Sequence, residues 1–250
     1  MSEQSGAAVD FFHLSRYVLQ ITTSILAGAA LFCSVTGAAL KDEHLRTEAA
    51  LSAVVVGVAA YHYQQLLEEL RSANQLGDPI TKAMYRIRTS DWIVTLPIMA
   101  IETRLILTTC NVVDDSYDFL IYVVPLLQAL VPILGAVASE FGSKNMVPFT
   151  VLFLCSCAAF GACLLAFVVP LFRANPPPVW NVKRSLLMIN FVQLGYPLVF
   201  LFTEVAKSSG GNELTLFLET VFYAVLDVAT KFTLAIVSML VIYQENGCVV

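Results

Sequence analysis

The chain has 250 residues, of which 58% are hydrophobic and 13% are charged, and its formal net charge is −5. A soluble domain usually has about a quarter of its residues charged, so this composition indicates that most of the chain lies in lipid. The positive charges form no basic tract, and we therefore expect no nucleic-acid partner.

Long apolar runs follow one another along the chain, with short polar connections between them. A helix that crosses a bilayer needs about 20 apolar residues. The runs lack the alternation of polar and apolar residues that a membrane β-barrel requires. The sequence therefore predicts an all-α membrane protein, a single domain over residues 1–250 that forms a bundle of seven transmembrane helices. The expected helices span residues 11–40, 47–70, 84–110, 119–138, 147–172, 185–202 and 214–243.

An odd number of crossings places the two ends of the chain on opposite sides of the membrane. Basic residues favour the inner side, and their distribution slightly favours an extracellular N-terminus. That orientation puts inside Lys41, Arg46, Arg104, Arg173, Lys183 and Arg184, and puts outside Arg71, Lys82, Lys144 and Lys207. We expect kinks inside the helices at Pro97, Pro125, Pro132 and Pro197.

Ionisable residues interrupt the third and seventh apolar runs. A charge inside a membrane is costly, so such a residue usually has a function. Asp227 and Lys231 are four residues apart and share one helical face. Asp91 and Glu102 also share a face, about 16 Å apart along the helix axis. Lys231 and Asp227 alone would suit a structural ion pair, but Asp91 and Arg88 in addition favour a functional site.

A lysine in an apolar interior is a good amine nucleophile and condenses with an aldehyde to a Schiff base. The protonated product needs anionic partners, for which Asp91 and Asp227 are the obvious pair. Arg88 lies one turn from Asp91, and we expect it to hold both carboxylates ionised.

Three motifs resemble those of the microbial (type 1) rhodopsins. They are RTSDWIVTLP over residues 88–97, LDVATK ending at Lys231, and the pair Tyr196-Pro197. The resemblance covers essentially the whole chain. It implies that all-trans retinal lies inside the bundle, bound covalently to Lys231, with Trp92, Tyr196 and Pro197 beside it.

The third helix also resembles the outward proton pumps of the proteorhodopsin kind, which have the pattern Asp-Thr-Glu found here at Asp91, Thr95 and Glu102. The resemblance implies that Asp91 accepts the proton, Asp227 is a second counterion and Glu102 is the proton donor. We expect Thr95 to hydrogen-bond Asp91. His62 matches a histidine that hydrogen-bonds the proton acceptor in such pumps, although a satisfied interfacial histidine is an alternative.

Glu204 and Glu219 match the pair that forms the extracellular proton-release group of bacteriorhodopsin. Three other positions concern the retinal itself. Gln193 replaces a tryptophan that the family usually has beside the retinal, Phe200 fills a further aromatic position, and Met99 occupies a position linked to colour.

The sequence thus predicts a light-driven outward proton pump that is not an enzyme, has no metal site and is an integral multi-pass membrane protein. Its expected partners are membrane lipid and protons, and the family resemblance implies a trimer or pentamer of identical chains. A photosensory rhodopsin, or a light-regulated module that signals to a partner or channel, is the main alternative. A light-gated channel, a sodium pump and a transporter or receptor without retinal are less favoured.

Overall fold

The computed structural model describes residues 10–72, 78–113, 118–142, 145–173, 180–208 and 212–245. In these ranges the chain forms seven crossing segments, because α6 and α7 are two parts of one span and α8, η2 and α9 are three parts of another. The elements are α1 (Phe11–Ala39), α2 (Glu43–Ser72), α3 (Asp78–Thr109), α4 (Asp118–Phe141), α5 (Met146–Arg173), α6 (Trp180–Gln193), α7 (Gly195–Ser208), α8 (Glu213–Asp227), the π-helical turn η2 (Val228–Phe232) and α9 (Thr233–Glu245).

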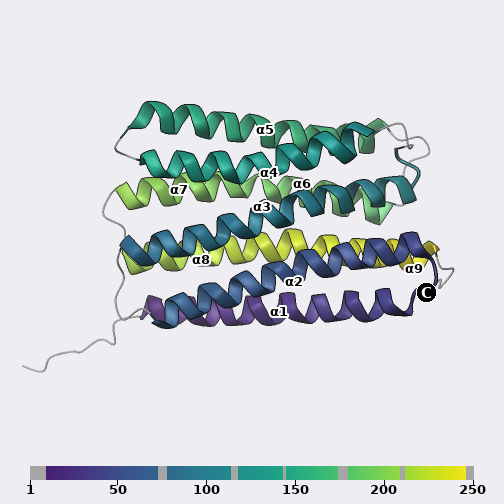
Figure 1. Cartoon of the computed structure of the whole chain (residues 1–250), viewed down its shortest axis with the longest axis horizontal. Helices are drawn as coiled ribbons and strands as arrows, with labels where there is room; N and C mark the ends of the chain where they lie inside the picture. Colours follow the sequence, from purple (N-terminus) through teal and green to yellow (C-terminus); the bar gives the residue numbers. More distant parts are fainter. Residues whose placement is uncertain are drawn as a thin grey trace, which may run out of the picture.

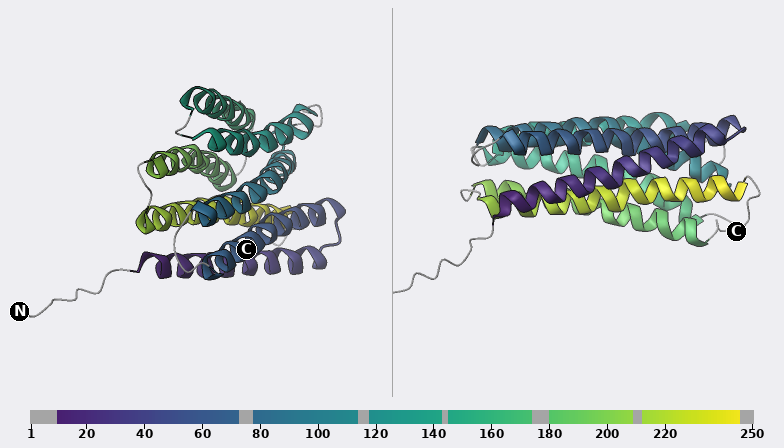
Figure 2. Two further views of the ribbon diagram at one scale, coloured as in Figure 1. Left: turned by 60° about the vertical axis from the view of Figure 1, so that its left-hand side comes forward. Right: turned by 90° about the horizontal axis from the view of Figure 1, so that it is seen from below.

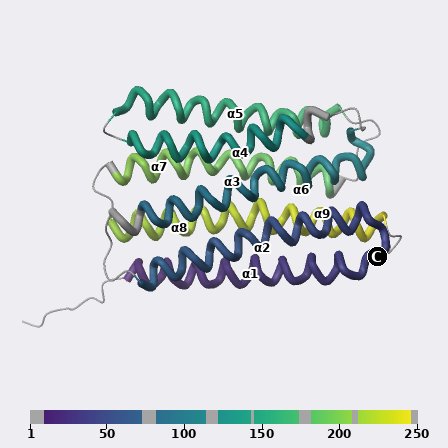
Figure 3. The backbone as a smooth tube through the Cα atoms, in the orientation of Figure 1, coloured from purple at the N-terminus to yellow at the C-terminus, as the bar shows by residue number. Residues whose placement is uncertain are grey.

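The helices lie side by side with their long axes in nearly one direction (Figure 1). From α1 to α5, each helix packs against the next one along the chain. Helix α1 also contacts α8, and α9 contacts both α2 and α6, so the last segment lies between the first helices and the sixth span. The tube in Figure 3 shows that α1 begins at one end of the bundle and α9 finishes at the other. The predicted seven-helix bundle is confirmed.

The distribution of side chains is that of a protein surrounded by lipid. Large apolar side chains point outward, among them Leu126, Val147 and Phe191, each more than 70% exposed. Many polar and ionisable side chains are instead buried between the helices. Six of the spans in the described part of the chain are long and apolar enough to cross a membrane. Helix α2, the more polar exception, packs against both α1 and α3. Figure 2 shows the bundle from two further sides.

The helices extend beyond the apolar runs that predicted them. Helix α3 begins at Asp78 instead of residue 84, and α4 ends at Phe141 instead of residue 138. Pro79 lies in the first turn of α3, where the missing N–H has no carbonyl partner to lose. The apolar run marks only the part of a helix that faces lipid, whereas the backbone hydrogen bonds continue into the polar ends.

The sixth span is broken at Leu194, which the prediction of one helix over residues 185–202 missed. Pro197 has no N–H to donate to the carbonyl of Gln193, four residues earlier. Helix α7 starts at Gly195, so Pro197 lies in a first turn and not inside a helix as we expected. A Cβ at Gly195 would come within 2.6 Å of a methyl group of Leu226, so a larger residue there would displace the Leu226 side chain of α8. Pro97, Pro125 and Pro132 do lie inside helices.

Candidate functional site

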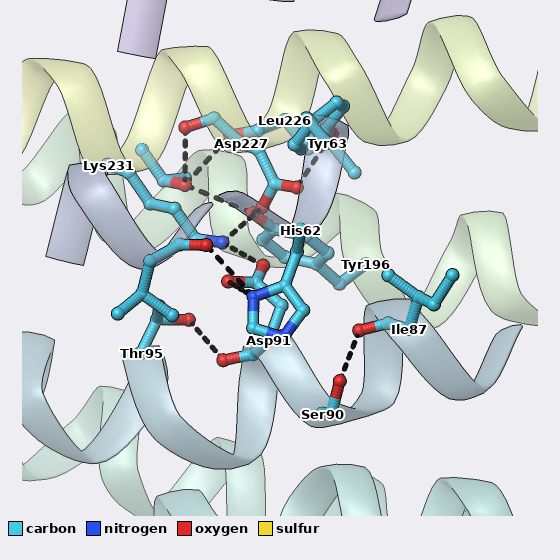
Figure 4. Close-up of polar contacts among 12 residues, drawn as sticks. His62, Tyr63, Ile87, Ser90, Asp91, Thr95, Tyr196, Leu226, Asp227 and Lys231 are labelled. Carbon is cyan, nitrogen blue, oxygen red and sulfur yellow. Dashed lines mark hydrogen bonds and ion pairs between the residues drawn. The ribbon is translucent and has the colours of Figure 1, made fainter. Parts of the chain in front are cut away.

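Lys231 is the centre of the buried polar cluster. It lies in η2, the π-helical turn that interrupts the seventh span, and only 1% of the residue is exposed. π-turns inside α-helices occur frequently at functional sites. Its Nζ donates to Oδ2 of Asp91 on α3 and lies 3.2 Å from Oδ1 of Asp227, one turn earlier in its own span. A single ammonium group therefore lies between two carboxylates that come from two helices (Figure 4).

Asp227 is fixed by two tyrosines. The hydroxyl of Tyr196, on α7, donates to Oδ1 of Asp227 at 2.6 Å, and the hydroxyl of Tyr63, on α2, donates to Oδ2 at 2.8 Å. Tyr196 also lies 3.1 Å from the hydroxyl of Thr230. Three spans thus hold one carboxylate in place beside Lys231 (Figure 4). The sequence had indicated Tyr196 but not Tyr63, which adjoins His62 and was hidden in a run of other polar and aromatic residues.

Asp91 has one oxygen that is bonded and one that is not. Its Oδ2 accepts from Lys231, while its Oδ1 has no hydrogen-bond partner among the described residues. Nδ1 of His62 lies 3.7 Å from that Oδ1, which is too long for a hydrogen bond. The same Nδ1 lies 2.9 Å from the carbonyl oxygen of Val58 in its own helix. His62 therefore faces Asp91 as expected, but it bonds its own helix.

Thr95 does not hydrogen-bond the carboxylate of Asp91. Its hydroxyl donates to the backbone carbonyl of Asp91 at 2.9 Å, the usual bond of a threonine to the residue four positions earlier in a helix. Thr95 thus hydrogen-bonds Asp91 as expected, but at the backbone carbonyl, which lies within reach of the short Thr95 side chain.

Arg88 pairs with Glu219 and not with the two aspartates. Its Nη1 donates to Oε1 of Glu219 on α8, its Nη2 lies 3.5 Å from the hydroxyl of Thr220, and its guanidinium lies 4.8 Å from the ring centre of Tyr223. Among the described residues no ion pair joins Arg88 to Asp91 or Asp227, so its effect on the charge of the two carboxylates stays a prediction. Helical side chains lean toward the N-terminal end of their helix, which directs the long arginine side chain away from Lys231.

Glu204 and Glu219 do not form a hydrogen-bonded pair. Glu204, on α7, accepts from Lys207 at 3.1 Å and from Ser139 of α4 at 3.2 Å. Each glutamate therefore has a basic partner of its own. The two residues match the bacteriorhodopsin release group in being glutamates, but they do not contact each other here. Both lie on the Arg88 side of Lys231, which leaves a route of ionisable groups toward that end of the bundle.

Glu102 is buried on the other side of Lys231, eleven residues after Asp91 on α3 and about 16 Å from it along the axis. The hydroxyl of Ser52, on α2, donates to its Oε1, and its Oε2 has no hydrogen-bond partner among the described residues. Buried carboxyl groups thus lie on both sides of Lys231. The sequence had not indicated Ser52, because a serine in an apolar helix is unremarkable until its partner is known.

Two cavities lie near this cluster. The larger encloses about 610 Å³ that protein atoms leave free, part of it open to the outside, and aromatic and apolar side chains line most of it. Trp92, Tyr196, Pro197 and Phe200, all named from the sequence, are in its wall. Trp92 also packs edge-on against Tyr196, with ring centres 5.6 Å apart.

Gln193 and Met99 line the smaller cavity together with two further buried amides, Gln128 and Asn190. Leu96 lines both cavities. The structure therefore places Gln193 in a polar recess next to the aromatic cavity, and its place beside the retinal stays a prediction. Among the described residues no three metal-binding side chains gather in one place.

The chemistry of these residues suits an elongated apolar ligand with an aldehyde group, since Tyr196 of the aromatic cavity bonds Asp227, which lies beside Lys231. The amine of Lys231 would bind its reactive end, and the aromatic cavity bounded by Trp92, Tyr196 and Phe200 would hold its apolar body. These are the requirements of retinal.

The family model for bacteriorhodopsin-like proteins matches residues 13–244. None of the curated proteins matches the chain in sequence. Solved structures do match it: xanthorhodopsin, described as a light-driven ion pump with a dual chromophore, has a TM-score of 0.78 at 19% identity and covers 96% of this chain and 97% of its own. A thermophilic rhodopsin has a TM-score of 0.75 at 21% identity and covers 95% and 96%.

Halorhodopsin, described as a light-driven chloride pump, has a TM-score of 0.70 at 18% identity and covers 93% of this chain and 97% of its own. At such identities these likenesses show the fold, while the family model covers most of the sequence. The chain therefore belongs to the bacteriorhodopsin-like family of microbial (type 1) rhodopsins and is an integral, multi-pass membrane protein.

Proposed function

We propose that the protein is a light-driven outward proton pump that carries retinal on Lys231. The observation that carries this proposal is the buried line of ionisable groups that runs through the amine of Lys231. Asp91 contacts the amine, Glu102 lies farther along one direction, and Arg88 with Glu219 lies in the other. Chains of buried carboxyl groups inside a membrane typically serve as proton relays.

Retinal bound to Lys231 would supply the light-driven isomerisation that changes the surroundings of the Lys231 nitrogen. The side chains of the protein would then move the proton. Asp91 receives it on Oδ2, the oxygen that already contacts that nitrogen. Asp227 keeps its place because Tyr63 and Tyr196 both donate to it.

Once Asp91 is neutral, the attraction of Arg88 toward the centre weakens, so less electrostatic force opposes its pair with Glu219. We propose that the proton then passes from Asp91 toward the Arg88 end, where the carboxylates of Glu219 and Glu204 take it up in turn and give it to water. Glu102 returns a proton to the Lys231 nitrogen from the opposite side. His62 faces the oxygen of Asp91 that has no hydrogen-bond partner among the described residues, and from there it influences how strongly Asp91 holds its negative charge. With the N-terminus outside, the Arg88 end is extracellular and net transport is outward.

A chloride pump is the alternative that the likeness to halorhodopsin raises. An anion bound beside Lys231 would meet the carboxylates of Asp91 and Asp227, which already contact the amine. Like charges at such distances repel strongly inside a protein. This geometry favours the proton over an anion as the transported ion.

The deciding experiment is the light-induced pH change in an unbuffered suspension of cells that contain the protein and retinal. We expect the medium to acidify in light, and we expect a protonophore to abolish the change. Asp91→Asn is the matched control, since it removes the proton acceptor and retains the size of the side chain. A coloured protein that responds to light without any pH change would refute the pump and favour the photosensory alternative.

A further inference from the structure

Glu48 is a buried carboxyl group that the proposed transport path does not use. It lies near the start of α2 and is 0% exposed. Its Oε1 accepts from the hydroxyl of Ser238 on α9 at 3.2 Å, and its Oε2 has no hydrogen-bond partner among the described residues. No basic side chain in the described part of the chain forms an ion pair with it. A buried carboxyl group without a basic partner is costly, so its presence calls for a functional explanation.

Glu48 and Glu102 have matching surroundings. Each accepts one serine hydroxyl, from Ser238 and Ser52 respectively, and each has its Oε2 without a partner among the described residues. Both serines are 0% exposed. Ser52 follows Glu48 by four residues on α2, so the two side chains are neighbours on one helical face. The hydroxyl that reaches Glu102 is therefore one helical turn from Glu48.

The position of Glu48 suits the entrance of a path. Ser52 is level with Glu102, and Glu48 lies about 6 Å nearer the end of the bundle, by the rise of four helical residues. This is the end at which α2 begins and α9 finishes (Figure 1). Ionisable groups near Glu48 include Glu102 on α3, Cys110 in the turn after α3 and Glu245 at the end of α9. Glu245 is exposed, so acidic groups extend from Glu48 to the aqueous end.

We propose that Glu48 is the proton-loading group of the intracellular half, which takes a proton from water and passes it through Ser52 to Glu102. This inference rests on the proposed proton pump. The Ser52 hydroxyl accepts one proton and gives its own to the Glu102 carboxylate, so Ser52 itself is unchanged. Glu102 becomes the acid, and Glu48 becomes a carboxylate that water at the aqueous end protonates again.

Glutamine at position 48 separates this role from a structural one. The amide oxygen of glutamine accepts the Ser238 hydrogen bond and fills the same volume, but the amide cannot give and regain an acidic proton. A structural role would therefore survive Glu48→Gln, whereas a relay would not. Glu43→Gln is the matched control, because Glu43 lies five residues earlier on the same helix and is exposed.

The test is flash photolysis of the retinal-loaded protein in lipid vesicles, with a pH-sensitive dye that follows proton uptake. We expect Glu48→Gln to slow uptake by about a hundredfold, the lower end of what a positioned proton-transfer group contributes. Proton release and the loss of the Glu102 proton keep their rates. Infrared difference spectra should lose one carboxylic-acid band in Glu48→Gln and none in Glu43→Gln.

Uptake in Glu48→Gln as fast as in Glu43→Gln, with no infrared band lost, would overturn the role of Glu48. If Glu48→Gln does not bind retinal, Ser52→Ala becomes the deciding variant, because it removes the hydroxyl that connects Glu48 to Glu102. Proton uptake slowed about tenfold or more in Ser52→Ala supports the path. Unchanged uptake refutes the path. The two proposals fail differently. The absence of any light-driven proton uptake by the unsubstituted protein refutes the pump, whereas normal uptake in Glu48→Gln beside slow uptake in Glu102→Gln refutes only the relay.

Discussion

The ion pair of Arg88 and Glu219 gives the sharpest prediction of stability. Both side chains are only 4% exposed, and their contact joins α3 to α8. Glu219→Gln leaves the guanidinium buried without its anion, and breaking a buried pair in this way costs about 3–5 kcal/mol. The contacts of Arg88 with Thr220 and Tyr223 remain and offset a part of this, since a desolvated cation over an aromatic ring contributes about 2 kcal/mol. We therefore expect a loss near the lower end of the range.

Glu204→Gln is the internal control, because it breaks a second glutamate pair at the same end of the bundle. Lys207 is 28% exposed in that pair, so water solvates it when its partner is lost. Exposed pairs contribute about 0.2–1 kcal/mol. The structure thus predicts a clear difference between two substitutions of identical chemistry.

The free energy of unfolding should be measured by denaturant titration in mixed micelles, with and without retinal, so that changes in colour are separated from changes in folding. The double variant Arg88→Gln/Glu219→Gln removes both charges. Its loss of stability should be smaller than the sum of the losses in the two single variants, and the difference is a coupling free energy of about 0.5–3 kcal/mol. A Glu219→Gln variant no less stable than Glu204→Gln, or strictly additive single substitutions, would refute the buried pair.

Three further predictions concern the transport path. Lys231→Ala should give colourless protein after addition of retinal, because no other described lysine lies between two carboxylates. The visible absorption spectrum checks this, and colour that survives the substitution would refute the retinal site at Lys231. Asp91→Asn should abolish the light-induced pH change and shift the absorption to the red, since it removes a negative charge beside Lys231. Glu102→Gln should slow the return of the proton to the Lys231 nitrogen in flash photolysis, and azide should restore the rate; an unchanged rate would exclude Glu102 as donor.

The hydropathy of the sequence was sufficient to predict the bundle, because lipid demands long apolar runs and closed backbone hydrogen bonding. It was also sufficient to place Lys231 and Asp227 on one face, since helical spacing is fixed. The break at Leu194 and the π-turn at Lys231 were not predicted. Both depend on local backbone hydrogen bonds, and an apolar run of given length is equally compatible with a continuous helix.

Contacts between spans were the least predictable part of the site. Tyr63 reaches Asp227, and Ser52 reaches Glu102, across helices whose relative rotation the sequence does not specify. The ion pair of Arg88 with Glu219 was not predicted either, because sequence spacing pointed to the nearby Asp91, whereas the Arg88 side chain points toward Glu219. Short spacing within one helix predicts a shared face, but a long side chain chooses its partner by the direction in which it points.

The two halves of the bundle differ in a way that bears on the direction of transport. On the Arg88 side, the buried carboxylates have basic partners, so their negative charge is compensated as soon as a proton leaves. On the other side, Glu48 and Glu102 have serine hydroxyls as their hydrogen-bond partners. A hydroxyl compensates a buried negative charge far less than a cation does, so a proton lost from these two groups is replaced more readily than one lost near Arg88. This asymmetry supports proton flow from the Glu48 end to the Arg88 end, which is the direction that an extracellular N-terminus makes outward.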